Sequence, residues 1–224
     1  MGQYYHPQII TNGLVTLIDP ANQRSYPRSG TTAFSLTGNH NATLTGGVGF
    51  GTSNMGVFNF DGVNDYLDLG NSAGGSGVAI STGTINVWAK TSSPGSSYRG
   101  IVAKQFAYGL FYKDSILIAY DWANIGGGDR TTNINLADNQ WKNISYSFQT
   151  GVSNGSIIYI GGTSVNTGNL TINNQGQSLA VGAEPVAGSQ FSNCTIGHFA
   201  LYNRVLTADE IRRNFNALRN RYGV

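Results

Sequence analysis

Apolar side chains recur at helical spacing close to the end of the chain. Ile211, Phe215, Leu218 and Tyr222 follow one another at steps of four, three and four residues, which places them along one face of an α-helix. Polar residues, mostly arginine and asparagine, occupy the positions between them. A lone helix cannot bury such a stripe by itself, so we expect it to dock on a sheet.

The residues around this stripe indicate where the helix begins. Thr207 is followed three positions later by Glu210, the pattern of a capping box that satisfies free backbone N–H groups. Leu206 and Ile211 flank the first turn as a hydrophobic staple. Together these signals predict a helix over residues 208–222.

Short apolar runs bounded by turn residues fill the chain before the helix. Residues 84–90 alternate strictly, with Ile85, Val87 and Ala89 on one face. Trp88 on the other face is apolar as well, so we expect this strand to be covered on both sides. The predicted strands are residues 14–18, 57–60, 66–69, 84–90, 101–103, 108–112, 116–120, 141–149, 157–160, 178–181 and 195–202.

The spacing of these strands, with Gly- and Asn-rich turns between them, predicts an all-β fold. We expect a two-sheet antiparallel β-sandwich of the jelly-roll type, with one C-terminal α-helix docked on it. Lys113-Asp114 between two of the strands predicts a tight hairpin. A length of 224 residues suits one such domain, which we place at residues 12–224 after an N-terminal extension at residues 1–11.

The composition limits the classes of protein to which this chain can belong. Only 11% of the residues are charged, against about 25% in typical soluble domains, and 31 residues are glycine. Amides and hydroxyls therefore solvate the surface, as on extracellular, virion and carbohydrate-binding proteins. The net charge of +2 says little about partners, but the chain has no Lys/Arg run like those of nucleic-acid-binding arms. No stretch is apolar enough to span a membrane, and no signal-peptide pattern is visible at the N-terminus, so we expect synthesis in a cytoplasm.

The densest cluster of positive charge in the chain consists of four arginines on the predicted helix. We interpret this polar face as solvent surface, in preference to a contact with nucleic acid, a membrane or a neighbouring subunit. The four arginines are Arg212, Arg213, Arg219 and Arg221.

Four blocks of sequence follow one another in a specific order and spacing. They are GLVTLIDPAN at residues 13–22 with SYP at 25–27 and GTT at 30–32; FDGVNDYLDL at 60–69; INVWAK at 85–90; and Trp141 with its strand, IYIGG at 158–162 and LYNRVLT at 201–207. Together they resemble a laminin-G-like module of the concanavalin A-like lectin/glucanase superfamily. The resemblance implies two antiparallel sheets packed face to face, in a fold that hosts enzymes, lectins and adhesion modules.

The first block and the final segment NFNALRNRYG at residues 214–223 resemble a narrower set of proteins. These are laminin-G-like structural proteins of tailed bacteriophages, especially those that infect cyanobacteria. Such proteins often carry an Asp-Leu-Ser-Gly-Asn turn, whereas this chain has SLTGN at residues 35–39. The missing acidic residue argues against a metal at that turn.

Catalysis of the glucanase type needs a pair of carboxylates about 5 Å apart. The resemblance implies that they would lie on a Glu-x-Asp-x-x-Glu strand, and this chain lacks that pattern. Its two glutamates are Glu210, which belongs to the capping box, and Glu184, which stands alone in a predicted loop. His6, His40 and His198 lack metal-ligand spacing. We therefore expect that the chain is not an enzyme.

Calcium is the metal that the resemblance suggests, and no other cofactor is expected. Asp61, Asn64, Asp65 and Asp68 form the densest group of oxygen ligands in the chain, and oxygen ligands are what Ca²⁺ prefers. The alternative is that Asp61-Gly62 makes a turn and Asn64-Asp65 caps the next one by bonding its own backbone.

Sugar binding is the second open question. Lectin sites stack an aromatic ring on a sugar face and hold the hydroxyls with polar groups. Trp122, with Asp121 and Asn124 beside it, is the first candidate, and Tyr98 with Arg99 is the second. The alternative is that Trp122 packs beneath the glycine-rich loop that follows it.

These observations favour a non-enzymatic virion structural protein, located in the virion after synthesis in the host cytoplasm. It would be an outer capsid decoration, fibre or tail-associated subunit, with other virion proteins and further copies of itself as partners, and with cell-surface glycans as a further ligand. A free carbohydrate-binding module is the alternative. We expect neither nucleic acid nor a membrane as a partner.

Overall fold

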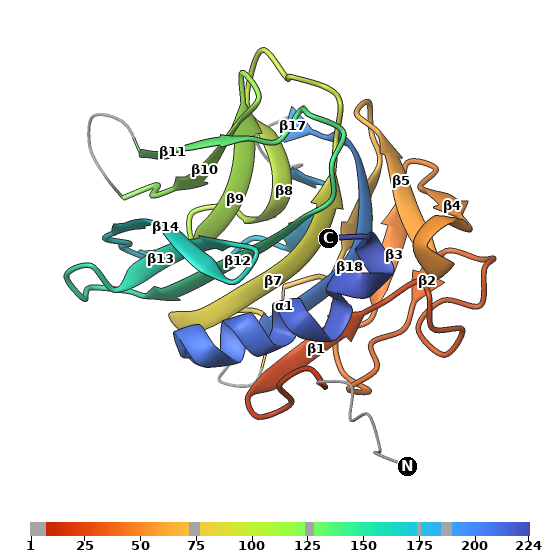
Figure 1. Cartoon of the computed structure of the whole chain (residues 1–224), viewed down its shortest axis with the longest axis horizontal. Helices are drawn as coiled ribbons and strands as arrows, with labels where there is room; N and C mark the ends of the chain where they lie inside the picture. The colour runs from red at the N-terminus through yellow and green to blue at the C-terminus, as the bar shows by residue number, and fades with distance from the viewer. Residues whose placement is uncertain (1–7, 72–76, 124–127, 174–175, 185–189) are drawn as a thin grey trace.

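Two antiparallel sheets form the body of the protein, with a helix on the outer face of one of them (Figure 1). The structure is a computed structural model that describes residues 8–71, 77–123, 128–173, 176–184 and 190–224. Within these residues each large sheet has eight strands. This confirms the predicted all-β sandwich with a C-terminal helix. Among the described residues, no helix has the length and apolar character that crossing a bilayer requires.

The first sheet, sheet A, carries the helix. Its central strand is β18, which pairs with β7 on one side and with β5 and then β1 on the other. In spatial order its strands are β14 (Thr163–Gly168), β13 (Ser156–Ile160), β12 (Lys142–Gln149), β7 (Thr82–Lys90), β18 (Asn193–Tyr202), β5 (Val57–Asp61) and β4 (Gly49–Gly51), with β1 (Leu14–Ile18) beside β18.

The second sheet, sheet B, faces it. In spatial order its strands are β11 (Asp129–Asn135), β10 (Ile116–Tyr120), β9 (Tyr108–Lys113), β8 (Arg99–Lys104), β15 (Leu179–Val181), β6 (Tyr66–Asp68), β3 (Ala42–Thr45) and β2 (Thr32–Ala33). A small pair, β16 (Ala183–Glu184) and β17 (Gln190–Phe191), lies beside β8. The remaining elements are the 3₁₀ turn η1 (Ser53–Met55) and the helix α1 (Ala208–Tyr222).

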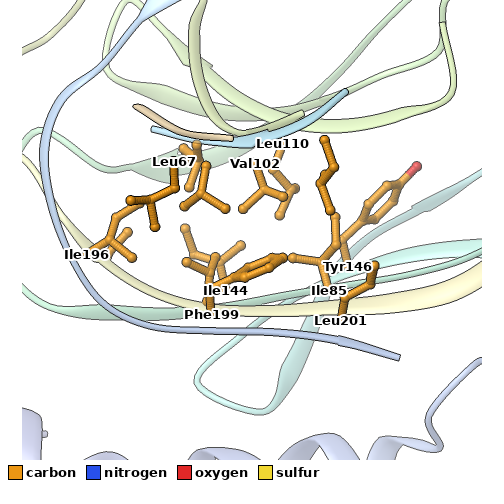
Figure 2. Packing of buried hydrophobic residues seen from close by; sticks show 14 of the residues in the cluster. Leu67, Ile85, Val102, Leu110, Ile144, Tyr146, Ile196, Phe199 and Leu201 are labelled. Carbon is orange, nitrogen blue, oxygen red and sulfur yellow. The ribbon is translucent and has the colours of Figure 1, made fainter. Parts of the chain in front are cut away.

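The hydrophobic core lies between the two sheets. Figure 2 shows Leu67, Val102 and Leu110 of sheet B facing Ile144 and Phe199 of sheet A. All five side chains are at most 1% exposed. Alternate positions on each strand supply these contacts, because successive side chains of a strand point to opposite faces.

Sheet A is also apolar on its outer face, and α1 covers that face. Trp88 on β7 is fully buried, and its ring stacks on Tyr222 with 4.2 Å between centroids and on Phe215 at 5.8 Å. A Cβ on Gly197 would lie 2.4 Å from the Tyr222 hydroxyl, so glycine is needed there. Covering of the β7 strand on both sides is therefore confirmed.

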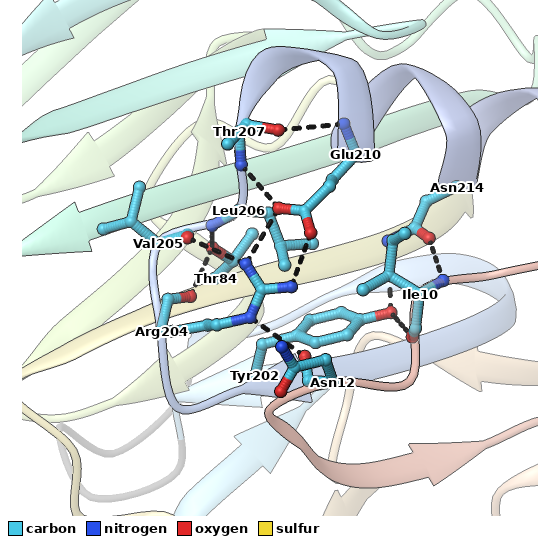
Figure 3. A network of polar contacts seen from close by, with 10 residues as sticks. All are labelled: Ile10, Asn12, Thr84, Tyr202, Arg204, Val205, Leu206, Thr207, Glu210 and Asn214. Atoms are coloured by element: carbon cyan, nitrogen blue, oxygen red, sulfur yellow. Dashed lines mark hydrogen bonds and ion pairs between the residues drawn. The ribbon is translucent and has the colours of Figure 1, made fainter.

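The predicted helix start is also confirmed (Figure 3). The Thr207 hydroxyl accepts from the Glu210 N–H at 3.3 Å, and the Glu210 carboxylate accepts from the Thr207 N–H at 2.9 Å. Glu210 also forms a two-pronged ion pair with Arg204 at 2.6 and 2.8 Å. The Arg204 hydrogen bonds, helped by the Thr207 N–H, lower the pKa of Glu210 to about 2.

Arg221 does not lie on the solvent face, where the sequence pattern placed it. Its side chain is only 9% exposed, and it donates to both carboxylate oxygens of Asp19 at 2.8 Å. It also donates to the carbonyls of Asn54, Gly56 and Gly197 at 2.7–2.9 Å. The prediction of a wholly solvated arginine face is wrong at this position, because the guanidinium is turned toward Asp19 and toward carbonyls of the η1 region and β18.

Asn214 is the second polar position of the helix that turns inward. It is 1% exposed, accepts from the Ile10 N–H at 2.7 Å and donates to the Tyr202 hydroxyl at 3.1 Å. Arg213 donates to the Gln8 carbonyl at 2.9 Å. Residues 8–10 of the predicted N-terminal extension therefore lie against the helix.

Sequence patterns located the central strands and missed several at the edges. The missed strands include β11 and β14, whose side chains are mostly exposed and polar, so apolar alternation does not mark them. The hairpin predicted near Lys113 is present, with Asp114 and Ser115 as its two turn residues. Both have positive φ, 49° and 73°, as a tight two-residue hairpin turn requires.

We expect replacement of Arg221 by lysine to lower the free energy of unfolding by about 3 kcal/mol, because removal of one partner leaves buried polar groups unsatisfied. Arg219→Lys, at an exposed position two residues before Arg221, is the matched control and should change stability by less than about 0.5 kcal/mol. Urea denaturation of both variants gives the comparison. Equal stabilities would show that the Arg221 contacts contribute little.

The Arg204–Glu210 pair makes a second prediction, which concerns pH. A carboxylate whose pKa is lowered on folding stabilises the protein above its unfolded pKa, and this contribution is lost as the pH falls toward the folded pKa. Glu210→Gln should therefore destabilise the protein by about 1 kcal/mol or less at pH 7. The difference from the wild type should shrink between pH 4.5 and about 2, in denaturant titrations at each pH. A difference that stays constant over this range would contradict the assignment.

Candidate functional site

An aromatic cluster covers part of the outer face of sheet B. Tyr108, Leu110 and Tyr112 of β9 point into the core, so Phe111 between them points outward. Phe111 packs there with Ala103 and Ile118, and the partly buried rings of Tyr98, Tyr120 and Trp122 lie against them. The helix lies on the other sheet (Figure 1). These rings therefore cover the strands beneath them and remain partly open to solvent.

A pocket of about 90 Å³ lies among these rings. Tyr98, Phe111, Tyr120 and Trp122 line it, with neighbouring ring centroids 5.1–6.2 Å apart and mostly edge to face. Glu184 and Gln190, which pair across β16 and β17, supply the polar part of its lining. An apolar wall with a few converging polar groups is the usual construction of a small-molecule site.

Gly109 leaves the space that the pocket needs. It lies opposite Tyr120 in the pairing of β9 with β10. A Cβ at this position would lie 2.6 Å from the Phe111 ring and 2.8 Å from the Trp122 ring. Trp122 therefore rests directly on the backbone of β9, and its position is fixed by the sheet.

Polar contacts hold the Tyr98 side of the pocket. The Tyr98 hydroxyl donates to the Asp129 carboxylate at 2.8 Å, and the Lys113 ammonium lies 4.6 Å from the centre of the Tyr98 ring and 3.8 Å from Asp129. Burial, together with the hydrogen bond and the negative charge of Asp129, raises the pKa of Tyr98. Tyr98 is therefore a neutral phenol at physiological pH, with its ring held in place.

The structure brings two of the sequence candidates for sugar binding together and separates the others. Tyr98 and Trp122 line one pocket, and Trp122 is partly exposed. Residues 124–127 of the loop that follows Trp122 lie outside the described residues. Asp121 points elsewhere, accepting from the backbone N–H groups of Ala123 and Thr171 at 3.1 and 3.3 Å. Arg99 donates to the Phe191 carbonyl at 3.2 Å. Asn124 lies outside the described residues.

Sequence reasoning missed Phe111, Tyr120, Glu184 and Gln190 as parts of this site. Tyr120 could have been found, because it precedes Trp122 by two positions and a strand returns to the same face every second residue. Glu184 was assigned to a loop, whereas it lies in β16 and is 2% exposed. Its approach to the aromatic rings depends on pairing between segments distant in sequence.

The candidate calcium residues contact their own backbone. Asp61 accepts from the N–H of Val63 at 2.8 Å, and Asp65 accepts from the N–H of Asp61 at 3.0 Å. Asp68 accepts from the N–H of Gly70 at 2.8 Å. Asn64 donates its own N–H to Asp61 at 3.4 Å. No group of three or more His, Cys, Asp or Glu side chains suited to a metal occurs in the described part of the chain.

These contacts are those of the turn-cap alternative. Calcium binding by these four residues stays a prediction. Burial is the main reason that the pKa of Asp65 is raised, which is consistent with a carboxylate enclosed in the turn.

Solved structures with a similar fold include both enzymes and receptor-binding domains. A Trypanosoma rangeli sialidase in complex with sialic acid matches with a TM-score of 0.72 and 14% identity, over 95% of this chain and 34% of that chain. The binding domain of Paraclostridial Mosquitocidal Protein 1 matches with a TM-score of 0.65 and 17% identity, over 92% and 52%. The receptor binding domain of botulinum neurotoxin C/D mosaic serotype matches with 0.64 and 13%, over 91% and 51%.

These likenesses correct the prediction that the chain is not an enzyme. About a third of each sialidase chain shares the fold, so the missing Glu-x-Asp-x-x-Glu strand excludes the glucanase arrangement alone and does not exclude catalysis. At identities below 20% the likeness shows the fold only, and it assigns neither activity nor ligand to this chain. The chain spans about a third of the length of the sialidases and about half of the toxin domains.

A comparison with curated protein sequences finds no match. The family model described as the concanavalin A-like lectin/glucanases superfamily matches residues 61–212, which is most of the chain. Its range includes β7, the strands of the aromatic pocket and the start of the helix. The chain therefore belongs to the concanavalin A-like lectin/glucanase superfamily.

Proposed function

We propose that this chain is a lectin-like domain that binds glycans through the aromatic pocket on the outer face of sheet B. The observation that carries the proposal is the joining of Tyr98 and Trp122 in one partly exposed pocket. Their rings offer apolar surface to the C–H face of a sugar, while Glu184 and Gln190 offer groups that bond hydroxyls. The fold is shared with lectins and with toxin receptor-binding domains.

The pocket is suited to binding because it is built before a ligand arrives. Trp122 rests on Gly109, and Tyr98 is fixed by Asp129 and Lys113. A rigid site loses little conformational freedom on binding, so more of its contact energy contributes to affinity.

We expect Trp122→Ala to weaken glycan binding by about tenfold or more, because truncation of a central aromatic contact costs about 2 kcal/mol. The measurement is a glycan array followed by calorimetry on the glycans that bind. Phe34→Ala removes an exposed aromatic side chain (44% exposed) that does not line the pocket and is the matched control. Circular dichroism checks that both variants fold. Unchanged binding by a folded Trp122→Ala variant would remove the pocket from the proposal.

We also propose that the domain acts on a virion, as an outer capsid decoration, fibre or tail-associated subunit. The support is the resemblance of residues 13–22 and 214–223 to structural proteins of tailed bacteriophages. The two proposals are compatible, since a subunit on the outside of a particle can adhere to cell-surface glycans. The alternative remains a free carbohydrate-binding module.

Mass spectrometry of purified virions from the phage that encodes this chain tests the virion role. We expect the chain in amounts comparable to known structural subunits, and cross-linking to join it to other virion proteins or to further copies of itself. Its absence from the particle, with presence in the lysate, would favour the free module.

A further inference from the structure

The aromatic pocket is the first of three adjoining depressions. Trp122 lines the pocket and also a second depression, of about 150 Å³, that includes Phe106, Ala123 and Asn173. Ala123 in turn lines a third and larger one, a polar groove of about 570 Å³. The three depressions therefore adjoin one another at Trp122 and Ala123.

The polar groove lies between the edge strands of the two sheets. Within the described residues β11 pairs only with β10, and β14 only with β13. The two strands lie near one another at the same side of the sandwich (Figure 1). An edge strand leaves backbone N–H and C=O groups without strand partners.

Hydroxyl groups add to this supply of hydrogen-bonding atoms. Thr131 of β11, Thr167 of β14 and Thr171 just beyond β14 line the groove and are exposed. A hydroxyl both donates and accepts hydrogen bonds, as the hydroxyls of a sugar do. The groove therefore matches a neutral, polyhydroxylated ligand.

Arg130 holds the groove at a fixed width. From β11 it donates to the Ser156 hydroxyl and carbonyl on β13, and to the Asn166 amide oxygen on β14 at 2.7 Å. Asn166 donates back to the Thr131 carbonyl at 3.2 Å. These contacts join the edges of both sheets, so the groove does not need to form on binding.

The groove has no surplus of positive charge for an acidic ligand. Its lining includes the cation Arg130 and the carboxylates Asp121 and Asp129, and Asp129 also lies 3.8 Å from the Lys113 ammonium, so the two signs balance. An acidic sugar would lose the hydration of its charge without gaining a net attraction. Neutral sugars avoid this cost.

Phe106 is a further aromatic contact on the far side of Trp122. It is 40% exposed and has a φ of 65°, a left-handed conformation that is unusual for a bulky residue. Such conformations are concentrated at functional sites. Phe106 lies between β8 and β9 and lines the second depression, where a sugar that passes Trp122 would meet its ring.

We propose that the binding surface runs from the aromatic pocket, across Trp122 and Phe106, into the groove between β11 and β14, and that its ligand is an extended neutral oligosaccharide. This inference rests on the proposed glycan binding and adds its chain length and charge. A terminal monosaccharide would fill the aromatic pocket alone, whereas a longer chain would also bond Thr131 and Thr167.

Calorimetry with neutral oligosaccharides of increasing length tests the inference. The probes are gluco-, manno- and N-acetylglucosamine oligomers from monosaccharide to hexasaccharide, with sialyllactose as an acidic probe. We expect affinity to rise by about tenfold or more between the disaccharide and the longer chains of the preferred series, which corresponds to about 1.4 kcal/mol. Sialyllactose should bind more weakly than a neutral trisaccharide of that series.

Two variants test whether the groove is where the longer oligosaccharides gain their affinity. The double variant Thr131→Ala/Thr167→Ala should reduce the affinity for long chains toward that for the disaccharide and leave the disaccharide unchanged. Thr163→Ala, at an exposed threonine of β14 that does not line the groove, is the matched control. Because these threonines are exposed, the variants should fold, and thermal melting checks this.

The outcomes separate this inference from the proposed function. Equal affinity for short and long chains, with a loss in Trp122→Ala, would overturn the extended site and leave the aromatic pocket in place. Tighter binding of sialyllactose than of the neutral trisaccharide would overturn the preference for neutral ligands. Absence of binding to every probe and to the glycan array would overturn both proposals.

Discussion

The apolar outer face of sheet A is the constraint on which the rest of the structure depends. β7 and β18 run through the middle of this sheet and are buried at almost every position, so both faces of each strand have to be covered. The opposite sheet covers the inner side chains, and α1 covers the outer ones. The stack of Trp88 on Tyr222 lies at this contact, and Gly197 allows the close approach. Without the helix, the ring of Trp88 would be exposed to water.

Arg221 fixes the end of the helix that this contact requires. Its single guanidinium joins the turn after β1, the η1 region and β18 through Asp19, Gly56 and Gly197. A planar group with several fixed donors is suited to such a junction, because it satisfies a carboxylate and several carbonyls at once. Residues 8–10 are bound along α1 by Arg213 and Asn214.

Sheet B is also apolar on its outer face, but aromatic side chains cover that face in place of a helix, and these side chains form the candidate site. β8, β9 and β10 are also buried on both faces, yet α1 lies on the other sheet. Their outer face is covered by the rings of Tyr98, Tyr120 and Trp122, which remain partly exposed. A partly exposed aromatic surface has an unfavourable contact with water, which a ligand can relieve. The adjoining open side of the sandwich is tied by Arg130 and left polar, so apolar and polar surfaces meet at Trp122 and Ala123.

The sequence by itself determined the helix, its capping box and the central strands. Those signals are local: Thr207 and Glu210 are three residues apart, and apolar alternation is read within one strand. Long-range pairing decided the rest. Arg221 looked like a solvated cation because its partner Asp19 is 202 residues away. β11 and β14 gave no signal because exposed edge strands need no apolar pattern. Tyr98 and Trp122 could be named separately, but their meeting, and the approach of Glu184 to them, required the register of β8, β9, β10 and β16. A pocket made from several strands exists only once the sheet is formed.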